Sequence, residues 1–399
     1  MTSHRPFAYY LGGSSLWMAG MSLYGFLFTW LLVGVLEQPA DKAGVARSIA
    51  ELPPLALLLV GGLIGDRMNG RTYLLIMHLV MALPPLLIAF VYERGDLSYW
   101  WVVAYGVGMA GIQALSDPAR QAALSRVASF DVQRSVVIMT IATTGVGMLG
   151  FYLGGQLETL GLVEVLVIQS AFFLVGSLAT RLLPDLPSNP GSRPQLLDAV
   201  RVTWRTTQAR NIIGLNFLSS LFNAGAYIIA MPYIVKEVYG GDAAFLAQVM
   251  IVFTIGSVGS NALLYFVMPL LHPGRLFLFM QITRMVILGV LVLHPPLWLF
   301  YVALIGWGLN MGITTTLVRT TVQELAPEEN RSQVLSVLLL SFMVAAPVSA
   351  SLLGLVIDGF SPLAALIPGI AISAVIFVVG LGFSGLWQYR SASAALKAG

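Results

Sequence analysis

The stretch GLIGDRMNGR, residues 62–71, is a charged break between two long apolar segments, 45–65 and 72–92. An aspartate and two arginines stand here within six residues, while the segments on either side are mainly apolar. Because a helix that crosses a bilayer needs about 20 mainly apolar residues, both segments have the length of a membrane span. The stretch therefore predicts a short polar loop that joins two transmembrane helices.

Apolar segments of this kind continue along the whole chain. The 399 residues are 57% hydrophobic and 10% charged, against about 25% charged in ordinary globular chains, and the mean hydropathy is +0.84. This composition excludes a soluble protein. It predicts an all-α membrane protein with twelve transmembrane helices, near residues 9–36, 45–65, 72–92, 97–116, 135–157, 162–183, 211–235, 244–268, 276–293, 297–318, 333–357 and 363–387.

The charges indicate how these spans are oriented. Twelve spans place both termini on one side, and we expect that side to be the cytoplasm. The outer loops then hold only three of the 21 Lys and Arg residues (Lys42, Arg94 and Lys236), and the spans hold only Arg47 and Arg284. This is a strong positive-inside bias, which predicts a multi-pass protein of the inner (cytoplasmic) membrane. The basic pI of about 9.1 is thus a topology signal, and no nucleic-acid partner is expected.

The two halves of the chain resemble each other. Gly70-Arg71 in the first charged loop matches Gly274-Arg275, and Arg120 matches Arg319, each about 200 residues later. The segment between the halves is turn-forming at first and then amphipathic, as in QLLDAVRVTWRTTQAR. We therefore predict two pseudo-symmetric six-helix bundles, residues 1–183 and 211–399, joined by a cytoplasmic linker, residues 184–210.

With these features the chain resembles the major facilitator superfamily over essentially its full length. The loop at 62–71 is similar to the family signature, which implies a gating role for Gly62, Asp66, Arg67 and Arg71. The loops TTVQELAPEENRSQVLS and SDPARQAALSRVASFDVQRS resemble those of the exporter branch that includes the enterobactin exporter and macrolide efflux proteins. The fourth span lacks the central arginine of many drug/proton antiporters, and Phe151 replaces a proline in the fifth, which counts against proton antiport.

Few ionisable groups lie inside the spans, and each is a functional candidate because charge is costly in a bilayer. Arg47 and Glu51 are one helical turn apart in span two and can pair. Glu51 is either a carboxylate whose protonation alternates during transport or part of a structural ion pair near the headgroups. Arg284, the third coupling candidate, is either functional or a structural arginine that snorkels or bonds between helices. His78, in the third span, is either a proton carrier, because histidine ordinarily titrates near neutral pH, or a hydrogen-bonded supporting residue.

The resemblance also implies that spans one, four, seven and ten line a central substrate cavity. Polar and aromatic side chains in these spans suit a large amphipathic substrate; the alternative is that they hold helices together. The spacing of Asn216, Ser220, Asn223 and Tyr227 places them on one helical face. The candidate cavity residues are Trp17, Tyr24, Tyr105, Gln113, Asn216, Ser220, Asn223, Tyr227, Asn310 and Thr314.

Enzyme chemistry has little support in the sequence. There is no cysteine, the four histidines are scattered, and no cofactor or metal is expected. We predict a monomeric secondary transporter in the lipid bilayer, which uses protons to export an amphipathic small molecule such as a drug, a siderophore or a similar metabolite. The alternatives are an uptake or lipid-translocating transporter of the same fold and a non-transporting membrane sensor.

Overall fold

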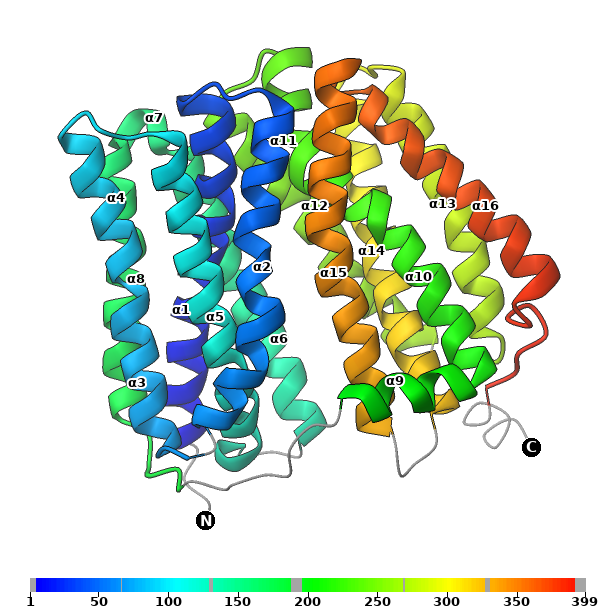
Figure 1. Cartoon of the computed structure of the whole chain (residues 1–399), viewed down its shortest axis with the longest axis horizontal. Coiled ribbons are helices and arrows are strands. Elements are labelled where there is room, and N and C mark those ends of the chain that lie inside the picture. The colour runs from blue at the N-terminus through cyan, green and yellow to red at the C-terminus, as the bar shows by residue number, and fades with distance from the viewer. Residues whose placement is uncertain are drawn as a thin grey trace. The chain divides into compact units, whose positions relative to one another are not determined.

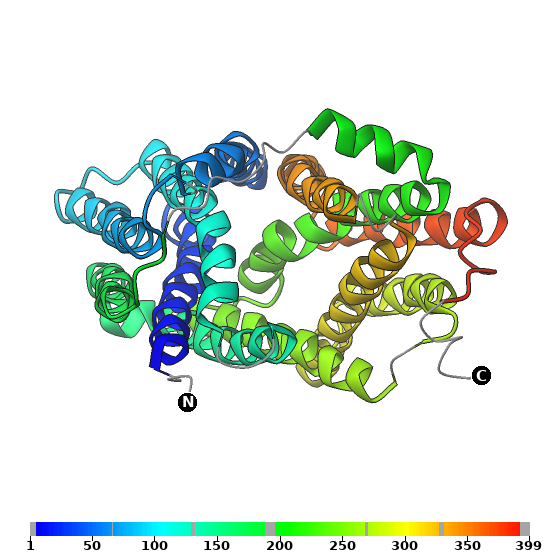
Figure 2. The same ribbon diagram turned by 90° about the horizontal axis from the view of Figure 1, so that it is seen from below.

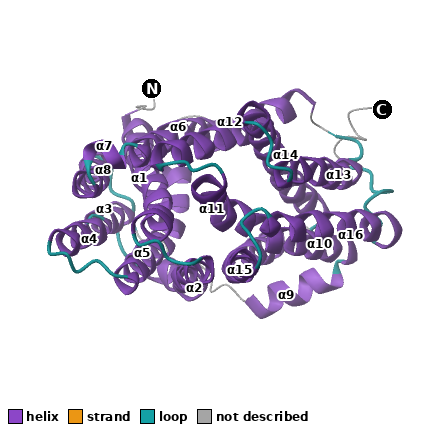
Figure 3. Cartoon of the chain, turned by 90° about the horizontal axis from the view of Figure 1, so that it is seen from above, coloured by secondary structure: helices purple, strands orange, loops and turns teal. Residues whose placement is uncertain are grey.

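The computed structural model describes residues 5–65, 67–128, 132–187, 196–267, 270–326 and 331–391, and within these ranges it contains helices and loops without a strand (Figures 1 and 3). A helical segment occupies each of the twelve predicted ranges. Ten segments of the described residues are long and apolar enough to cross a membrane. The other two are α2 (Ala40–Gly65) and α5 (Tyr99–Val127), full-length helices with charged residues near one end.

The chain divides into two compact units. Unit 1 consists of Met1–Pro39, Ala46–Ser192 and Gly240–Ile251, and unit 2 of Ala40–Val45, Arg193–Tyr239 and Val252–Gly399. Besides most of α2 and all of α5, unit 1 contains α1 (Arg5–Trp30), η1 (Leu31–Val35), α3 (Gly70–Met81), α4 (Leu83–Glu93), α6 (Val132–Gly155), α7 (Leu157–Leu160) and α8 (Leu162–Arg181). The third span is formed by α3 and α4 in succession (Figure 1).

Unit 1 is packed around α1, which lies against α6 and α8. Glycine permits the closest approach: a Cβ atom at Gly150 of α6 would collide with the carbonyl oxygen of Ala19 and lie 2.8 Å from the Leu23 nitrogen. Without interhelical water to expel, membrane helices associate through such close backbone packing. The small residues of the fifth span therefore join two helices of the same unit.

Unit 2 contains α9 (Leu196–Arg205), α10 (Thr207–Gly225), η2 (Ala226–Ala230), α11 (Met231–Tyr233), η3 (Ile234–Val238), part of α12 (Ala243–Val267), α13 (Pro273–Val292), α14 (Leu297–Leu325), α15 (Arg331–Gly359), η5 (Ala364–Leu366) and α16 (Ile367–Phe383). α13 packs against α14 and α16, and α10 packs against α15 and α16. A hydrophobic cluster that includes Phe277, Leu278 and Leu317 fills the space among these helices.

Two local features of unit 2 differ from straight transmembrane helices. The seventh span widens into π-helical turns at η2 and η3, so residues beyond Gly225 no longer follow the 3.6-residue period of α10. α9 lies across one end of the unit beside α15 (Figures 1 and 2). Its Ala199 and Thr203 are buried, while Trp204 is exposed, as expected for an amphipathic helix.

Candidate functional site

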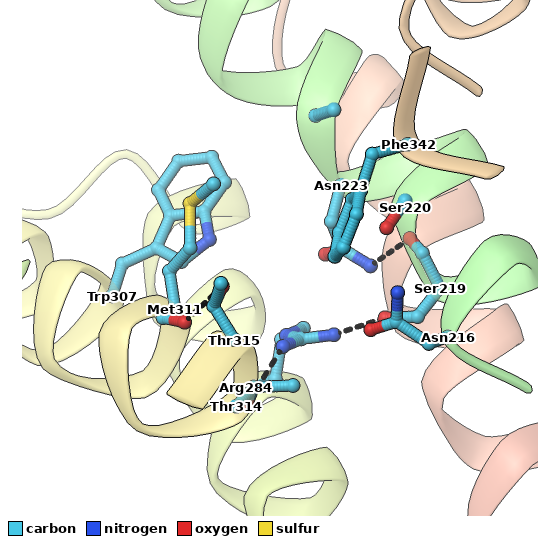
Figure 4. Close-up of a pocket in the computed structure, with 11 residues that line it drawn as sticks. Asn216, Ser219, Ser220, Asn223, Arg284, Trp307, Met311, Thr314, Thr315 and Phe342 are labelled. Atoms are coloured by element: carbon cyan, nitrogen blue, oxygen red, sulfur yellow. Dashed lines mark hydrogen bonds between the residues drawn. The ribbon is translucent and has the colours of Figure 1, made fainter. Parts of the chain in front are cut away.

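A small pocket of about 70 Å³ lies within unit 2, bounded by α10, α13, α14 and α15 (Figure 4). The side chains of α10 form one wall and those of α14 form the other, and Arg284 of α13 lies between them (Figure 4). The pocket is lined by Asn216, Ser219, Ser220, Asn223, Ala224, Arg284, Trp307, Met311, Thr314, Thr315 and Phe342. All of these residues belong to one unit, so the pocket is defined within a single helical bundle.

Arg284 is the most unusual residue of this pocket because it is a cation near the middle of α13 with only 4% of its surface exposed. Its Nε donates to Asn310 Oδ1 at 3.0 Å, and its Nη2 donates to Thr314 Oγ1 at 3.3 Å. Its Nη1 donates to Ser219 Oγ and to Gln281 Oε1, the latter at 3.4 Å. Neutral oxygens from three helices therefore hold the guanidinium, and none of these four partners is a carboxylate.

Asn310 of α14 fixes the orientation of this guanidinium through a hydrogen-bond network of its own. While its Oδ1 accepts from Arg284, its Nδ2 donates to the Met280 carbonyl at 2.7 Å and to Thr283 Oγ1 at 2.8 Å. Asn310 is 2% exposed, so these bonds are shielded from competing water. Because a buried donor without a partner is costly, the network holds Arg284 in one position.

On the α10 wall, two amide atoms are buried without a partner. Asn216 Nδ2 and Asn223 Oδ1 have no hydrogen-bond partner in the structure, although Asn223 Nδ2 donates to the Ser219 carbonyl at 2.8 Å. Buried polar groups are almost always satisfied. Both residues line the pocket, so its α10 wall carries one donor and one acceptor without a protein partner.

The remaining lining is apolar and aromatic. Trp307 and Met311 lie on the α14 wall, and Phe342 lies beside Asn223 on the opposite side (Figure 4). The Trp307 ring also packs edge-on against Tyr227, with ring centroids 6.1 Å apart. The pocket thus combines polar groups that can orient a ligand with surfaces that can bury an apolar body.

The structure brings together part of the predicted cavity set. Asn216, Ser220, Asn223 and Thr314 line the pocket, and Asn310 lies in its Arg284 network. Tyr227 is not among the lining residues; it stacks on Phe253 with ring centroids 4.0 Å apart. The widened turn of η2 explains this difference, because it shifts Tyr227 off the helical face that begins at Asn216.

Among the lining residues that the sequence prediction did not single out are Ala224, Trp307, Met311, Thr315 and Phe342. All of these except Thr315 are apolar or aromatic residues in apolar spans, where they carry no distinguishing signal. Gln281 was also missed, although Gln281 and Arg284 stand three residues apart and so mark a polar face on α13. That spacing is the signal from which one could have predicted that Arg284 faces the interior of the helical bundle.

The cavity candidates of the first half lie in the packed interior of unit 1. Tyr105 donates to Gln169 Oε1 at 2.7 Å, and Tyr24 donates to the Gly106 carbonyl at 3.3 Å. Trp17 is 1% exposed, and Gln113 is half-buried. A substrate role for Trp17, Tyr24, Tyr105 and Gln113 remains a prediction.

A second group of polar residues lies beside Trp17. Its ring packs edge-on against His78, with centroids 4.9 Å apart, and Arg120 lies over it at 4.4 Å. His78 Nδ1 is 2.9 Å from the Leu74 carbonyl oxygen, and Nε2 is 3.4 Å from that of Gly13. A neutral imidazole carries one N–H, so His78 donates to one of these two carbonyls, on its own helix or on α1, and the geometry is compatible with a supporting histidine.

The coupling candidates of α2 form the predicted pair. Arg47 Nη2 lies 2.6 Å from Glu51 Oε1, and the two side chains are 15% and 25% exposed. The Arg47 guanidinium also lies 5.6 Å from the centre of the Phe28 ring. The geometry is compatible with both interpretations of Glu51, a structural partner or a proton carrier.

The charged loop at 62–71 is attached to the segment that follows α8. Arg71 Nη2 lies 2.8 Å from Asp185 Oδ1, and Gly70 N donates to the Leu186 carbonyl at 2.8 Å. Gly62 lies within α2, and Arg67 is exposed. Asp66 lies outside the described residues, so the gating role of these residues remains a prediction.

Among the residues that the structure describes, no three His, Asp or Glu side chains come together in a way that could hold a metal ion. The pocket itself offers amide, hydroxyl and guanidinium groups, with only neutral oxygens as acceptors. These groups can bind a ligand directly through hydrogen bonds.

Comparisons with known proteins identify the fold. Residues 10–350 match the family model of the Major Facilitator Superfamily, while no curated protein matches the chain. The structure is similar to a variant of the nucleoside transporter NupG, with a TM-score of 0.78, 13% identity, and coverage of 95% of this chain and 99% of that one.

Two further solved structures have the same fold. One is a bacterial homologue of the human lysosomal transporter Spinster, with a TM-score of 0.68, 16% identity, and coverage of 97% and 98%. The other is a D-xylose-proton symporter, with a TM-score of 0.69, 13% identity, and coverage of 94% and 97%. At these identities the likeness shows the fold, and the predicted all-α membrane architecture is confirmed.

Proposed function

The chain belongs to the Major Facilitator Superfamily of membrane transporters, and on that premise we propose that it exports an amphipathic small molecule across the inner membrane. Residues 1–183 and 211–399 act as the two moving bundles, joined by residues 184–210. Rocking of the bundles exposes the binding site to each side in turn. The transporter works as a monomer with both termini in the cytoplasm.

The observation that carries this proposal is the composition of the pocket in unit 2. Amide and hydroxyl groups of α10 and α14 face the same space as Trp307, Met311 and Phe342. A substrate with one polar end and one apolar end satisfies both parts of the lining. Asn216 Nδ2 and Asn223 Oδ1 supply unused hydrogen-bonding capacity for the polar end.

Export is supported by the resemblance of two cytoplasmic loops to those of the enterobactin exporter and macrolide efflux branch. Uptake is the second candidate, because the D-xylose-proton symporter has the same fold. Importers and exporters share this fold, so a flux measurement is needed to decide the direction of transport.

Proton coupling is assigned in this proposal to the Arg47–Glu51 pair of α2. Arg47 and Glu51 form an ion pair at 2.6 Å, and loss of the carboxylate charge when a proton binds would weaken this pair and release the arginine. The chain contains no glycine-rich phosphate-binding loop with the P-loop spacing. The drive therefore comes from an ion gradient.

The test begins with a screen of drugs and metabolites on cells that lack or carry the gene, followed by flux in proteoliposomes loaded with the compounds found. We expect efflux that depends on an inward proton gradient and stops when a protonophore dissipates it. Efflux that continues would refute proton coupling and leave facilitated diffusion. Net uptake would refute export, and absence of both flux and ligand-induced stabilisation across the panel would favour the membrane sensor.

A further inference from the structure

The feature of unit 2 that the proposed function does not use is the charge of Arg284. The guanidinium lies in the pocket, midway along a membrane helix, and is 4% exposed. A buried cation in a membrane protein normally pairs with an acid, because an uncompensated charge is costly in a medium of low polarity. Here the four hydrogen bonds of the side chain all go to neutral oxygens.

The sequence contains no acid in the second half that could serve as an internal partner at this depth. The six acids of residues 211–399 all stand at or near the predicted ends of spans, far along the chain from the middle of α13: Glu237, Asp242, Glu324, Glu328, Glu329 and Asp358. The neutral ligands satisfy donors but do not cancel the positive charge. The pocket is therefore electrostatically incomplete.

The neighbouring groups add donors to this positive charge. Arg284 has five N–H groups, and four bonds to neutral acceptors leave one N–H on Nη2 available. Asn216 Nδ2 is a second buried donor without a partner, on the facing wall. A fixed cation and an unpaired amide donor in the lining of one pocket are groups that can bind a carboxylate or a phosphate.

We infer that the substrate carries an anionic group, a carboxylate or a phosphate, that binds Arg284 and Asn216 in this pocket. The inference rests on the proposed function, in which this pocket receives the polar end of an amphipathic substrate. The volume of about 70 Å³ is well below the roughly 300–1,000 Å³ of a pocket for a whole drug-sized ligand. It therefore holds the anionic head, while Trp307, Met311 and Phe342 contact the start of the apolar body.

The experiment compares three probes that share one aromatic body and differ only in the head: 2-naphthylacetate, 2-naphthyl phosphate and the neutral 2-naphthylacetamide. Binding to the purified full-length protein in detergent is measured by calorimetry and by the shift of the thermal unfolding midpoint. We expect at least one anionic probe to bind about tenfold or more tightly than the amide. Which anion binds better then distinguishes a carboxylate substrate from a phosphate substrate.

Three variants connect this preference to Arg284. Arg284→Gln should reduce the anion-to-amide affinity ratio to about one, whereas Arg284→Lys, which keeps the charge but loses the planar fork, should keep part of it. Arg205→Gln removes an exposed cation of α9 and should leave the ratio unchanged. If Arg284→Gln does not fold, the ratio of the wild-type protein and the Lys variant still test the inference.

The inference is overturned if the amide binds as tightly as both anions, if Arg284→Gln retains the preference, or if none of the three probes binds. Its failure can be separated from that of the proposed function. Flux of the neutral probe without any anion preference would leave the transporter standing and refute the anionic head. Arg284-dependent anion binding without flux of any probe would support the site and count against transport.

Discussion

Gln281→Glu should abolish the anion preference of the pocket by giving Arg284 an internal counter-ion. The two side chains have the same shape, and Gln281 Oε1 already accepts from Arg284 Nη1 at 3.4 Å. The change also replaces Nε2, which donates to the Phe277 carbonyl at 3.3 Å, by a carboxylate oxygen, and the new ion pair with Arg284 offsets the loss of this long hydrogen bond. The variant therefore alters the charge beside the guanidinium with little change in packing.

The magnitude follows from Coulomb's law. Two unit charges about 4 Å apart attract by about 4 kcal/mol at an effective dielectric constant of 20, and desolvation of the new carboxylate offsets much of that gain in stability. A bound anion would lose the same kind of attraction once the guanidinium is neutralised. We expect anion affinity to fall by about 10- to 100-fold, which corresponds to about 1.4–2.8 kcal/mol, while the amide probe binds as before.

Gln169→Glu is the matched control, because Gln169 is also 0% exposed. Its Nε2 donates to the Gly20 carbonyl at 3.0 Å, and its Oε1 accepts from Tyr105. The same substitution there turns a donor toward a carbonyl into an acceptor, so it should lower the thermal unfolding midpoint without changing the anion preference. Calorimetry with the naphthyl probes measures both variants. Unchanged anion affinity in a folded Gln281→Glu protein would refute the reasoning.

Three further predictions concern unit 1. Glu51→Gln should remove the pH dependence of proteoliposome transport, and an unchanged pH profile would eliminate its coupling role. Gly150→Leu should destabilise the protein by at least about 1–3 kcal/mol through overpacking against α1, whereas Gly145→Ala, with nothing within 4 Å of its Cβ, should change stability by less than about 1 kcal/mol; equal unfolding midpoints would contradict the packing argument. Loss of the Arg71–Asp185 pair, which is 37% and 68% exposed, should change stability by at most about 1 kcal/mol, as measured with Asp185→Asn.

Hydropathy and charge were sufficient to predict the helices, because membrane spans are defined by length and apolar content. The spacing of Asn216, Ser220 and Asn223 also predicted a shared face, since an α-helical period applies up to Gly225. The same period failed for Tyr227, because the wider turn of η2 begins at Ala226. A π-helical turn depends on tertiary packing, and the residue types of Ala226–Ala230 do not predict one.

Arg284 illustrates the other limit of the sequence. The sequence predicted that Arg284 lies within a span. The rotation of α13 about its own axis, however, decides whether the side chain faces lipid, a neighbouring helix or a pocket. That rotation is fixed by packing against α14 and α16, which pairs residues far apart in the chain, such as Arg284 with Asn310. Trp307 and Phe342 escaped prediction for the complementary reason that an aromatic residue in an apolar span is ordinary.

The sign of the substrate's charge also bears on the direction of transport. At a membrane potential of 100 mV, negative inside, moving one elementary charge is worth about 2.3 kcal/mol. Export of a monoanion in exchange for one proton moves two charges in the favourable sense, about 4.6 kcal/mol, whereas uptake of the same anion with one proton is electrically neutral. If Glu51 carries one proton and Arg284 binds a monoanion, a valinomycin-imposed potassium potential should accelerate export several-fold. A flux that does not change with the membrane potential would instead favour one-to-one symport of the anion with a proton, and therefore uptake.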